Sequence, residues 1–128
     1  MKALSSFTKS FVFAARGIKT VWKEERSFRV QVLGAIAVCF LMATFSLKPW
    51  EYIVLTLTIA GVLILEIVNT VVERFVDMVK PRLHSYVGSI KDMMAGAVLL
   101  MSFAATIIGA IIFIPHIIAF VIQYAHEI

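Results

Sequence analysis

Three apolar segments of this chain are each long enough to cross a lipid bilayer. They cover residues 30–47, 50–72 and 93–114. A membrane-spanning helix needs roughly 20 predominantly apolar residues, and within hydrocarbon only helices and closed barrels satisfy their backbone hydrogen bonds. Charged residues make up 16% of the chain, which is too few to cover a soluble domain. The sequence therefore predicts a single domain, residues 1–128, of the all-α integral membrane class, with three transmembrane helices.

The segment before the first span, residues 6–29, has the pattern of an amphipathic helix. Such a helix lies in the membrane interface and not across it. At the other end, Pro115 is expected to end or kink the third span, which leaves residues 115–128 as a C-terminal tail. In residues 6–29 the Lys and Arg residues fall on other faces than the apolar residues, which recur at helical spacing: Phe7, Phe11, Ala14, Ala15, Ile18, Val21 and Trp22.

The basic residues are distributed unevenly between the two sides of the predicted spans. Seven of the twelve precede the first span, four lie between Arg74 and Lys91, and Lys48 alone lies in the first short loop. Because loops rich in Lys and Arg stay in the cytoplasm, the N-terminus and the 73–92 loop are expected to be cytoplasmic. The net charge is +4, and the basic residues that produce it lie near the ends of the apolar spans. This pattern favours anionic lipid headgroups and ATP phosphates over nucleic acid as partners.

The second span carries a polar stripe formed by four residues, Glu66, Asn69, Glu73 and Asp77. The helix of this span is expected to continue with the stripe through residues 73–79, until Lys80-Pro81 stops it. At about 100° per residue, these positions fall within roughly 80° of one another on one helix face. A carboxylate inside a span costs roughly 2.5–3.5 kcal/mol on insertion scales. Taken singly, each residue fits a role in helix packing or at a helix end near water. Together they repeat acid on acid without a base, so the stripe needs a cation or a proton, and a divalent metal ion is the simplest supplier.

Two neighbouring segments add groups at the cytoplasmic level. Glu25 lies just before the first span, and the loop before the third span carries His84, Gly88, Lys91 and Asp92. Alone, Lys91 is an ordinary basic flank and Gly88 a turn residue. With the stripe they form a set suited to phosphoryl transfer, in which acids hold Mg²⁺, a lysine neutralises phosphate oxygens and a deeper carboxylate takes a proton. The sequence has no Walker-type glycine loop, so a nucleotide site must be built differently.

These residues resemble the prokaryotic diacylglycerol kinase family, which includes the undecaprenol kinases. The resemblance covers nearly the whole chain, from about Phe7 to Pro115, and its most specific part is the segment EIVNTVVE that runs from Glu66 to Glu73. The resemblance implies a homotrimer in the bacterial cytoplasmic membrane that phosphorylates a lipid alcohol with ATP and Mg²⁺. It extends through further polar and aromatic residues on both sides of this segment: Glu25, Phe28, Arg29, Asp77, His84, Lys91 and Asp92.

The same resemblance implies a role for each candidate site residue. Glu66 is the general base for the lipid hydroxyl, and Asn69 lies beside it. Glu25 and Glu73 hold magnesium that bridges the ATP phosphates. Phe13 is a departure, because some family members have a tyrosine there that contacts nucleotide. The nucleotide, directly or through the metal, is expected to contact Glu25, Glu73, Asp77, His84, Gly88, Lys91 and Asp92. The lipid headgroup or phosphate is expected to contact Arg16, Lys19 and Arg29.

Two questions stay open at this stage. The ending from Gly109 to Pro115 is more similar to the undecaprenol-directed branch than to the diacylglycerol branch, but both lipids present a primary hydroxyl, and the catalytic residues do not distinguish them. The residues also permit two functions outside the kinases. One is a small proton-coupled membrane transporter that uses Glu66 as its carrier, and the other is a structural assembly factor of the envelope. The transporter hypothesis assigns no role to Glu25 and Lys91.

Overall fold

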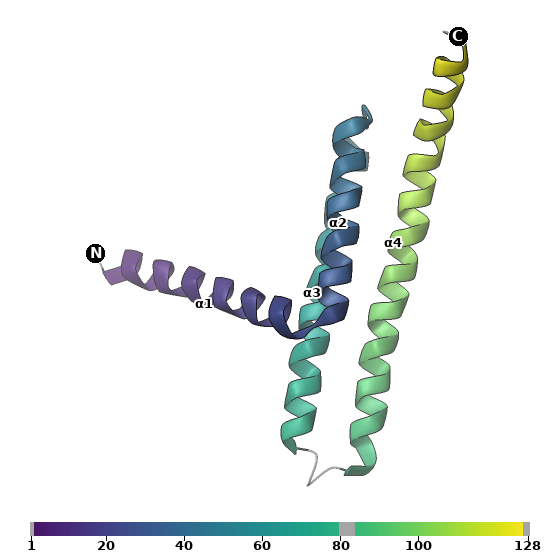
Figure 1. Ribbon diagram of the computed structural model, residues 1–128. Coiled ribbons are helices and arrows are strands. Elements are labelled where there is room, and N and C mark those ends of the chain that lie inside the picture. Colours follow the sequence, from purple (N-terminus) through teal and green to yellow (C-terminus); the bar gives the residue numbers. More distant parts are fainter. Residues whose placement is uncertain (1, 80–83, 127–128) are drawn as a thin grey trace.

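A computed structural model describes residues 2–79 and 84–126, with side chains for residues 7–79 and 86–126. Its helices are α1 (Lys2–Glu24), α2 (Arg26–Thr44), α3 (Pro49–Val79) and α4 (His84–His126). Figure 1 shows α2, α3 and α4 as a bundle from which α1 projects at a steep angle. The all-α class predicted from the apolar segments is confirmed.

Three of these helices are long and apolar enough to cross a membrane. The segments are Arg26–Thr44, Pro49–Val79 and Tyr86–His126. Large apolar side chains point outward from all three, for example Phe40, Leu57 and Leu100, which are each about two-thirds exposed or more. Helices that are apolar around most of their circumference are typical of membrane spans. The three predicted spans therefore correspond to α2, α3 and α4.

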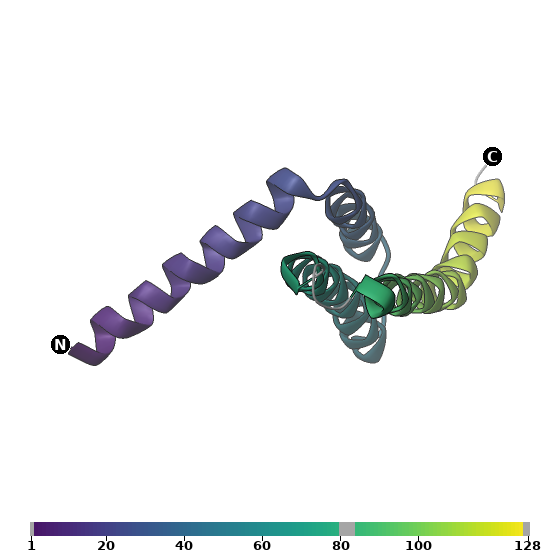
Figure 2. The same cartoon turned by 90° about the horizontal axis from the view of Figure 1, so that it is seen from below.

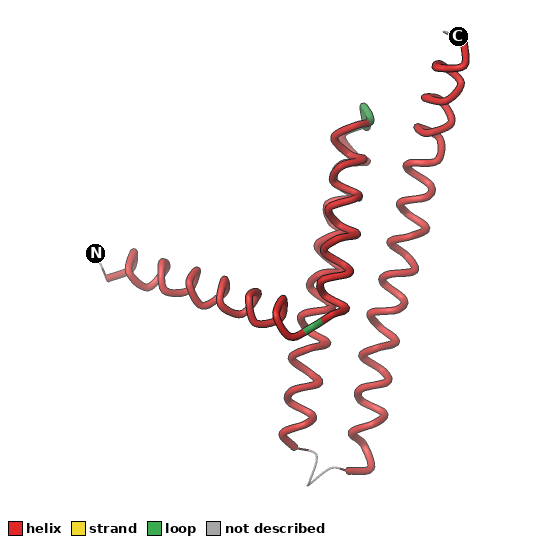
Figure 3. The backbone as a smooth tube through the Cα atoms, viewed as in Figure 1, coloured by secondary structure: helices red, strands yellow, loops and turns green. Residues whose placement is uncertain are grey.

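The chain changes direction at Glu25, the short loop between α1 and α2 in Figure 3. Glu25 is extended, with φ −102° and ψ 114°, while its N–H still donates to the Val21 carbonyl at 2.8 Å. Nη1 of Arg29 donates to the carbonyls of Trp22 (2.9 Å) and Lys23 (3.1 Å), which lie in the last turn of α1, where carbonyls lack helical partners. The helix predicted over residues 6–29 therefore ends at residue 24, and residues 26–29 form the first turn of α2.

A tight turn joins α2 to α3 (Figure 3). Phe45 leaves the helix with φ −98° and ψ 142°, and its N–H donates to the Leu41 carbonyl at 3.0 Å. Pro49 opens α3, where its missing N–H costs no helical hydrogen bond. Because residues 45–48 are needed to reverse the chain, α2 ends three residues before the predicted boundary. α3 runs beyond the predicted span to Val79, as its polar stripe led us to expect.

α4 continues through Pro115 to His126, so residues 115–126 are not the separate tail that was predicted. A proline removes a single backbone hydrogen bond, and helices in membranes commonly tolerate this loss. In the same turn, Nδ1 of His116 lies 2.8 Å from the Ile112 carbonyl. Figure 2 shows α4 bending toward its C-terminal end, so the proline bends the helix without ending it.

The main apolar core lies where the α2–α3 turn meets the second half of α4. Its buried members are Leu47, Leu55, Ile112 and Phe113. Farther along, α3 and α4 approach closely at Gly61, where an added Cβ would lie 2.6 Å from the Met101 methyl carbon. These contacts hold α3 between its two neighbours and fix which face it turns toward the α1–α2 junction.

Candidate active site

The polar stripe of α3 stays on one helix face in the structure. Nδ2 of Asn69 donates to Oε1 of Glu73 at 3.1 Å, as the four-residue spacing predicts. Exposure rises along the stripe: Glu66 is 3% exposed, Asn69 and Glu73 are half-buried, and Asp77 is exposed. At 1.5 Å per residue, the stripe is about 16 Å long. It therefore links a buried carboxylate to the open end of α3.

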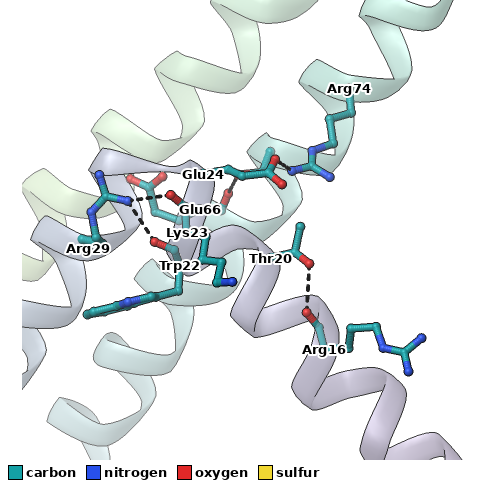
Figure 4. Close-up of polar contacts among 9 residues, drawn as sticks. Arg16, Thr20, Trp22, Lys23, Glu24, Arg29, Glu66 and Arg74 are labelled. Carbon is teal, nitrogen blue, oxygen red and sulfur yellow. Dashed lines mark hydrogen bonds and ion pairs between the residues drawn. The ribbon is translucent and has the colours of Figure 1, made fainter.

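Glu66 is the most enclosed acidic residue of the stripe, and its carboxylate contacts the start of α2. The hydroxyl of Ser27 donates to Oε2 of Glu66 at 2.9 Å. Thr70 donates to the backbone carbonyl of Glu66 at 3.0 Å, so its hydroxyl does not compete for the carboxylate. Figure 4 shows Glu66 next to the α1–α2 junction. Ser27 was not among the predicted site residues, because a serine in the first turn of a helix is too common to give a signal.

Asn69 has an unsatisfied oxygen next to this carboxylate. Its Oδ1 is fully enclosed and accepts no hydrogen bond from any residue that the structure describes. Since Nδ2 donates to the Glu73 carboxylate, turning the amide over would set oxygen against oxygen, which fixes the present orientation. A buried acceptor without a donor costs about 1–3 kcal/mol. This carbonyl is therefore suited to receive a hydrogen bond from a hydroxyl or water that is brought to the site.

Asp77 and Lys91, both predicted nucleotide residues, are brought together from α3 and α4. Nζ of Lys91 lies 2.7 Å from Oδ1 of Asp77. The two side chains are 35% and 54% exposed, and such exposed pairs contribute at most about 1 kcal/mol to stability. The ammonium carries three N–H donors and uses one of them here. The pair therefore presents a positive group at the water-facing end of the stripe.

Glu25 lies at the α1–α2 junction, two residues before Ser27. It is half-buried, and its side chain makes no capping hydrogen bond at the start of α2. Glu25 is thus close in sequence to the point where Ser27 bonds to Glu66. Among the residues whose side chains are described, no three His, Cys, Asp or Glu side chains gather into a ready-made metal site. A metal ion held by Glu25 and Glu73 would therefore need further oxygen ligands from elsewhere.

The remaining predicted site residues lie around these groups or apart from them. Gly88 and Asp92 are exposed on α4, near Lys91 in sequence. The His84 side chain lies outside the described residues. Arg16 is exposed and stacks over the Phe13 ring, with its guanidinium carbon 5.7 Å from the ring centre, and Lys19 is exposed on α1.

Two arginines, Arg29 of α2 and Arg74 of α3, contact the last turn of α1. Arg29, which was expected to contact substrate, bonds instead to carbonyls at the end of α1. Arg74 of α3 pairs with Glu24 of α1 (Figure 4), although neither residue was singled out in the sequence. Basic residues are frequent at the ends of membrane helices, so the sequence alone does not say which of them bind other parts of the same chain.

Comparisons with known proteins give one consistent result. The family described as prokaryotic diacylglycerol kinase matches residues 12–113, which include every candidate site residue. An undecaprenol kinase of Bacillus subtilis is 37% identical over 112 residues, covering 88% of this chain and 91% of that protein. A diacylglycerol kinase of Synechocystis is 33% identical over 114 residues, covering 88% and 65%. One from Escherichia coli is 25% identical over 108 residues, covering 84% and 88%.

Proposed function

Because the chain belongs to the prokaryotic diacylglycerol kinase family and is a lipid kinase, we propose that it transfers the γ-phosphoryl group of ATP to the hydroxyl of a membrane lipid alcohol. The observation that carries this proposal is the α3 stripe, in which Glu66 is almost fully buried while Asp77, eleven residues farther on, pairs with Lys91 in water. The transporter alternative gains no support from the family or the relatives.

Glu66 is the proposed general base. One of its oxygens, Oε2, is held by Ser27, which leaves Oε1 to take the proton of the lipid hydroxyl. The hydroxyl oxygen attacks the γ-phosphorus, the bond between that phosphorus and the bridging oxygen breaks, and ADP leaves. The enclosed Oδ1 of Asn69 lies one helical turn away and is suited to accept a hydrogen bond from the incoming hydroxyl or from a water.

The acidic residues fit Mg²⁺ by the chemistry of their donor atoms. Glu25 and Glu73 offer carboxylate oxygens, the ligands that a hard cation prefers, and Mg²⁺ commonly uses only one or two protein carboxylates together with phosphates and water. When bound, the ion neutralises charge on the phosphate oxygens. Asn69 holds one oxygen of Glu73 by its amide, which orients that carboxylate.

Lys91 is the residue that we propose contacts the phosphate groups of the nucleotide. Asp77 accepts one of its N–H groups, and the others are directed to phosphate oxygens of the nucleotide. Asp92, Gly88 and His84 lie within eight residues of Lys91 on α4 and complete the proposed nucleotide surface. Figure 1 supports this placement, because the ends of α3 and α4 project beyond the level where α1 meets α2.

We assign α1 to the cytoplasmic membrane interface of a bacterial cell. Its steep angle to the three spans in Figure 1 and its alternating apolar and basic residues fit a helix lying on the membrane surface. The excess of Lys and Arg on α1 and beside the α3–α4 connection supports a cytoplasmic location for both, where ATP is available. Arg16 and Lys19 then face anionic headgroups or the lipid phosphate product.

Undecaprenol is the proposed physiological substrate. The relative from Bacillus subtilis, at 37% identity, is an undecaprenol kinase, whereas the diacylglycerol kinases of Synechocystis and Escherichia coli are 33% and 25% identical. We further propose a homotrimer, because three helices are too few to enclose a nucleotide, a metal ion and a lipid. The third span offers small residues for close helix packing: Ala95, Gly96, Ala97, Ala104, Ala105 and Gly109.

The proposal is tested by a phosphorylation assay on the purified full-length protein in lipid vesicles. Labelled ATP and Mg²⁺ are supplied with undecaprenol, diacylglycerol or a control lipid without a hydroxyl. We expect label in the lipid phosphate from undecaprenol first, and none after Mg²⁺ is chelated. Failure to label any lipid alcohol, in protein whose helix content and unfolding transition are intact, contradicts the proposed function.

A further inference from the structure

We propose that Ser27 is a positioning residue that fixes the orientation of the Glu66 carboxylate for proton transfer. The inference rests on the proposed function, in which Glu66 is the general base. It adds a residue from a different helix, whose hydroxyl donates to Oε2 of Glu66 at 2.9 Å. Ser27 does not contact the reacting atoms in this arrangement, because it acts through the carboxylate.

The first ground for this role is that Ser27 has no rival. Among the residues that the structure describes, Ser27 supplies the one side-chain hydrogen bond to the Glu66 carboxylate. The nearest hydroxyl on the same helix, that of Thr70, donates to the Glu66 backbone carbonyl at 3.0 Å. Asn69 directs its amide to Glu73, away from Glu66. The orientation of the base therefore depends on a residue 39 positions away in the sequence.

The second ground is that the Glu66 side chain needs such a contact. A glutamate has three side-chain torsions, and its carboxylate samples several orientations unless a partner holds one oxygen. With Oε2 bonded to Ser27, Oε1 is the oxygen that keeps its hydrogen-bonding capacity for the substrate hydroxyl. Misplacing a catalytic group by about 1 Å is enough to cost a factor of about 100 in rate. A single hydroxyl at this point thus controls the geometry of proton transfer.

The third ground is that packing does not explain Ser27. Its side chain is exposed, so alanine at this position removes no buried apolar contact. Val21 and Phe28, which flank the junction, are buried there and supply the packing. The start of α2 is also fixed independently, through the two bonds from Arg29 to the end of α1. The hydroxyl is therefore available for positioning the carboxylate and is dispensable for folding.

The test compares three variants in vesicles: Ser27→Ala, Ser27→Thr and, as matched control, Ser102→Ala. Ser102 is a suitable control because its hydroxyl also bonds a side chain of α2, accepting from Nε2 of Gln31 at 3.2 Å, but its partner is an amide and not a carboxylate. For each variant, kcat and the KM values for ATP and lipid are measured together with the unfolding midpoint. Ser27→Thr keeps a hydroxyl donor, while Ser27→Ala removes it.

We expect Ser27→Ala to lower kcat by about 10- to 100-fold with both KM values changed less than about threefold. Ser27→Thr should recover kcat to within about threefold of the original enzyme, and Ser102→Ala should match it. In a Glu66→Gln background, Ser27→Ala should have no further effect on the residual rate, since the carboxylate that it positions is gone.

Several results overturn the inference. They are an unchanged kcat in Ser27→Ala, an equal loss in Ser27→Thr, an equal loss in Ser102→Ala, or a loss that follows the unfolding midpoint. Any of these leaves the kinase assignment standing, provided that the original protein phosphorylates a lipid alcohol. Absence of lipid phosphorylation in the original protein contradicts the proposed function itself and is seen before any variant is compared.

Discussion

The two halves of α3 each bury a glutamate, Glu51 in the first turn and Glu66 just past the middle of the helix, and the two carboxylates have different roles. Glu51 is 6% exposed and Glu66 is 3% exposed, and fifteen residues, or about 22 Å of helix, separate them. Glu51 accepts the backbone N–H of Lys48 at 2.6 Å, and Nε2 of His116 lies 3.7 Å from the same oxygen. The Glu66 carboxylate has a single serine hydroxyl as its partner.

The surroundings of Glu51 are closed and complete. Oη of Tyr52 donates to the Met42 carbonyl at 3.1 Å, which ties α3 back to the end of α2. The Phe45 ring lies 6.1 to 6.4 Å, centre to centre, from three rings of α4: those of Phe113, His116 and Phe120. Glu51 caps the start of α3 within this packed end, so its role is structural.

The half of α3 that carries Glu66 has a hydrogen-bonding group without a partner among the described residues and ends in contact with water. Asn69 keeps an enclosed oxygen without a donor, and Asp77 and Lys91 form their ion pair in contact with water. Burial of a carboxylate therefore does not mark a site in this protein, since Glu51 is buried as well. What distinguishes Glu66 is the unmet hydrogen-bonding capacity beside it and the polar path from it to the helix end.

The largest effect is expected from Glu66→Gln. Replacing the carboxylate by an amide of the same shape removes the base, and general-base catalysis contributes up to about 10⁴-fold, so kcat should fall by about 1,000-fold or more. The measurement is lipid phosphorylation in vesicles at saturating ATP. A residual rate within a factor of about ten of the original enzyme would show that Glu66 is not the base.

A smaller effect is expected from Lys91→Met, which removes a cation at the water-facing end of the stripe while keeping the chain length. The KM for ATP should rise by about 10- to 100-fold, because a charge-assisted bond to phosphate is lost. Lys23→Met provides the control, since Lys23 is exposed on α1 and the substitution keeps its backbone carbonyl, which accepts from Arg29. Equal KM values in the two variants contradict a phosphate contact at Lys91.

In the first turn of α3, Glu51→Ala should lower the stability of the protein and leave kcat unchanged. It leaves the Lys48 N–H without its acceptor, so the free energy of unfolding should fall by about 1–2 kcal/mol. The measurement is a denaturant titration of the detergent-solubilised protein, with kcat followed in parallel. A kcat reduced as strongly as in Glu66→Gln would show that Glu51 does not have a purely structural role.

The smallest effect is expected from Arg74→Gln. Arg74 and Glu24 form an ion pair whose side chains are 47% and 56% exposed, and pairs of this kind contribute little. The free energy of unfolding should change by less than about 0.5 kcal/mol. Thermal unfolding of Arg74→Gln beside Glu24→Gln checks this expectation, and a clear loss in both variants would show that α1 is held to α3 by this pair.

Periodicity predicted much of this molecule. Three apolar segments gave three helices, and the spacing of Asn69 and Glu73 correctly placed their side chains on one face, where they hydrogen-bond. The extension of α3 to Val79 also followed from its polar stripe. These features are local, because helix geometry alone relates residues three, four and seven positions apart.

The features that sequence reasoning missed depend on how helices cross. The contact of Ser27 with Glu66 requires the start of α2 to lie against the middle of α3, and no spacing rule contains that information. Glu51 was not among the predicted residues, because its burial depends on contact with α4, which brings His116 beside it. The sequence left open whether Pro115 ends or kinks the third span, because a proline usually marks a helix end outside membranes, and in the structure α4 continues through it.

The most direct test of the different roles of Glu66 and Glu51 is to measure kcat and the unfolding midpoint of Glu66→Gln and Glu51→Gln in the same vesicle preparation. Both substitutions keep the shape of the side chain and remove its charge. Glu66→Gln should lose almost all phosphoryl transfer while unfolding as the original protein does, and Glu51→Gln should keep kcat and unfold more easily. Substantial phosphoryl transfer by Glu66→Gln, or a comparable loss of phosphoryl transfer in Glu51→Gln, would contradict the assignment of the chemistry to Glu66 and its half of α3.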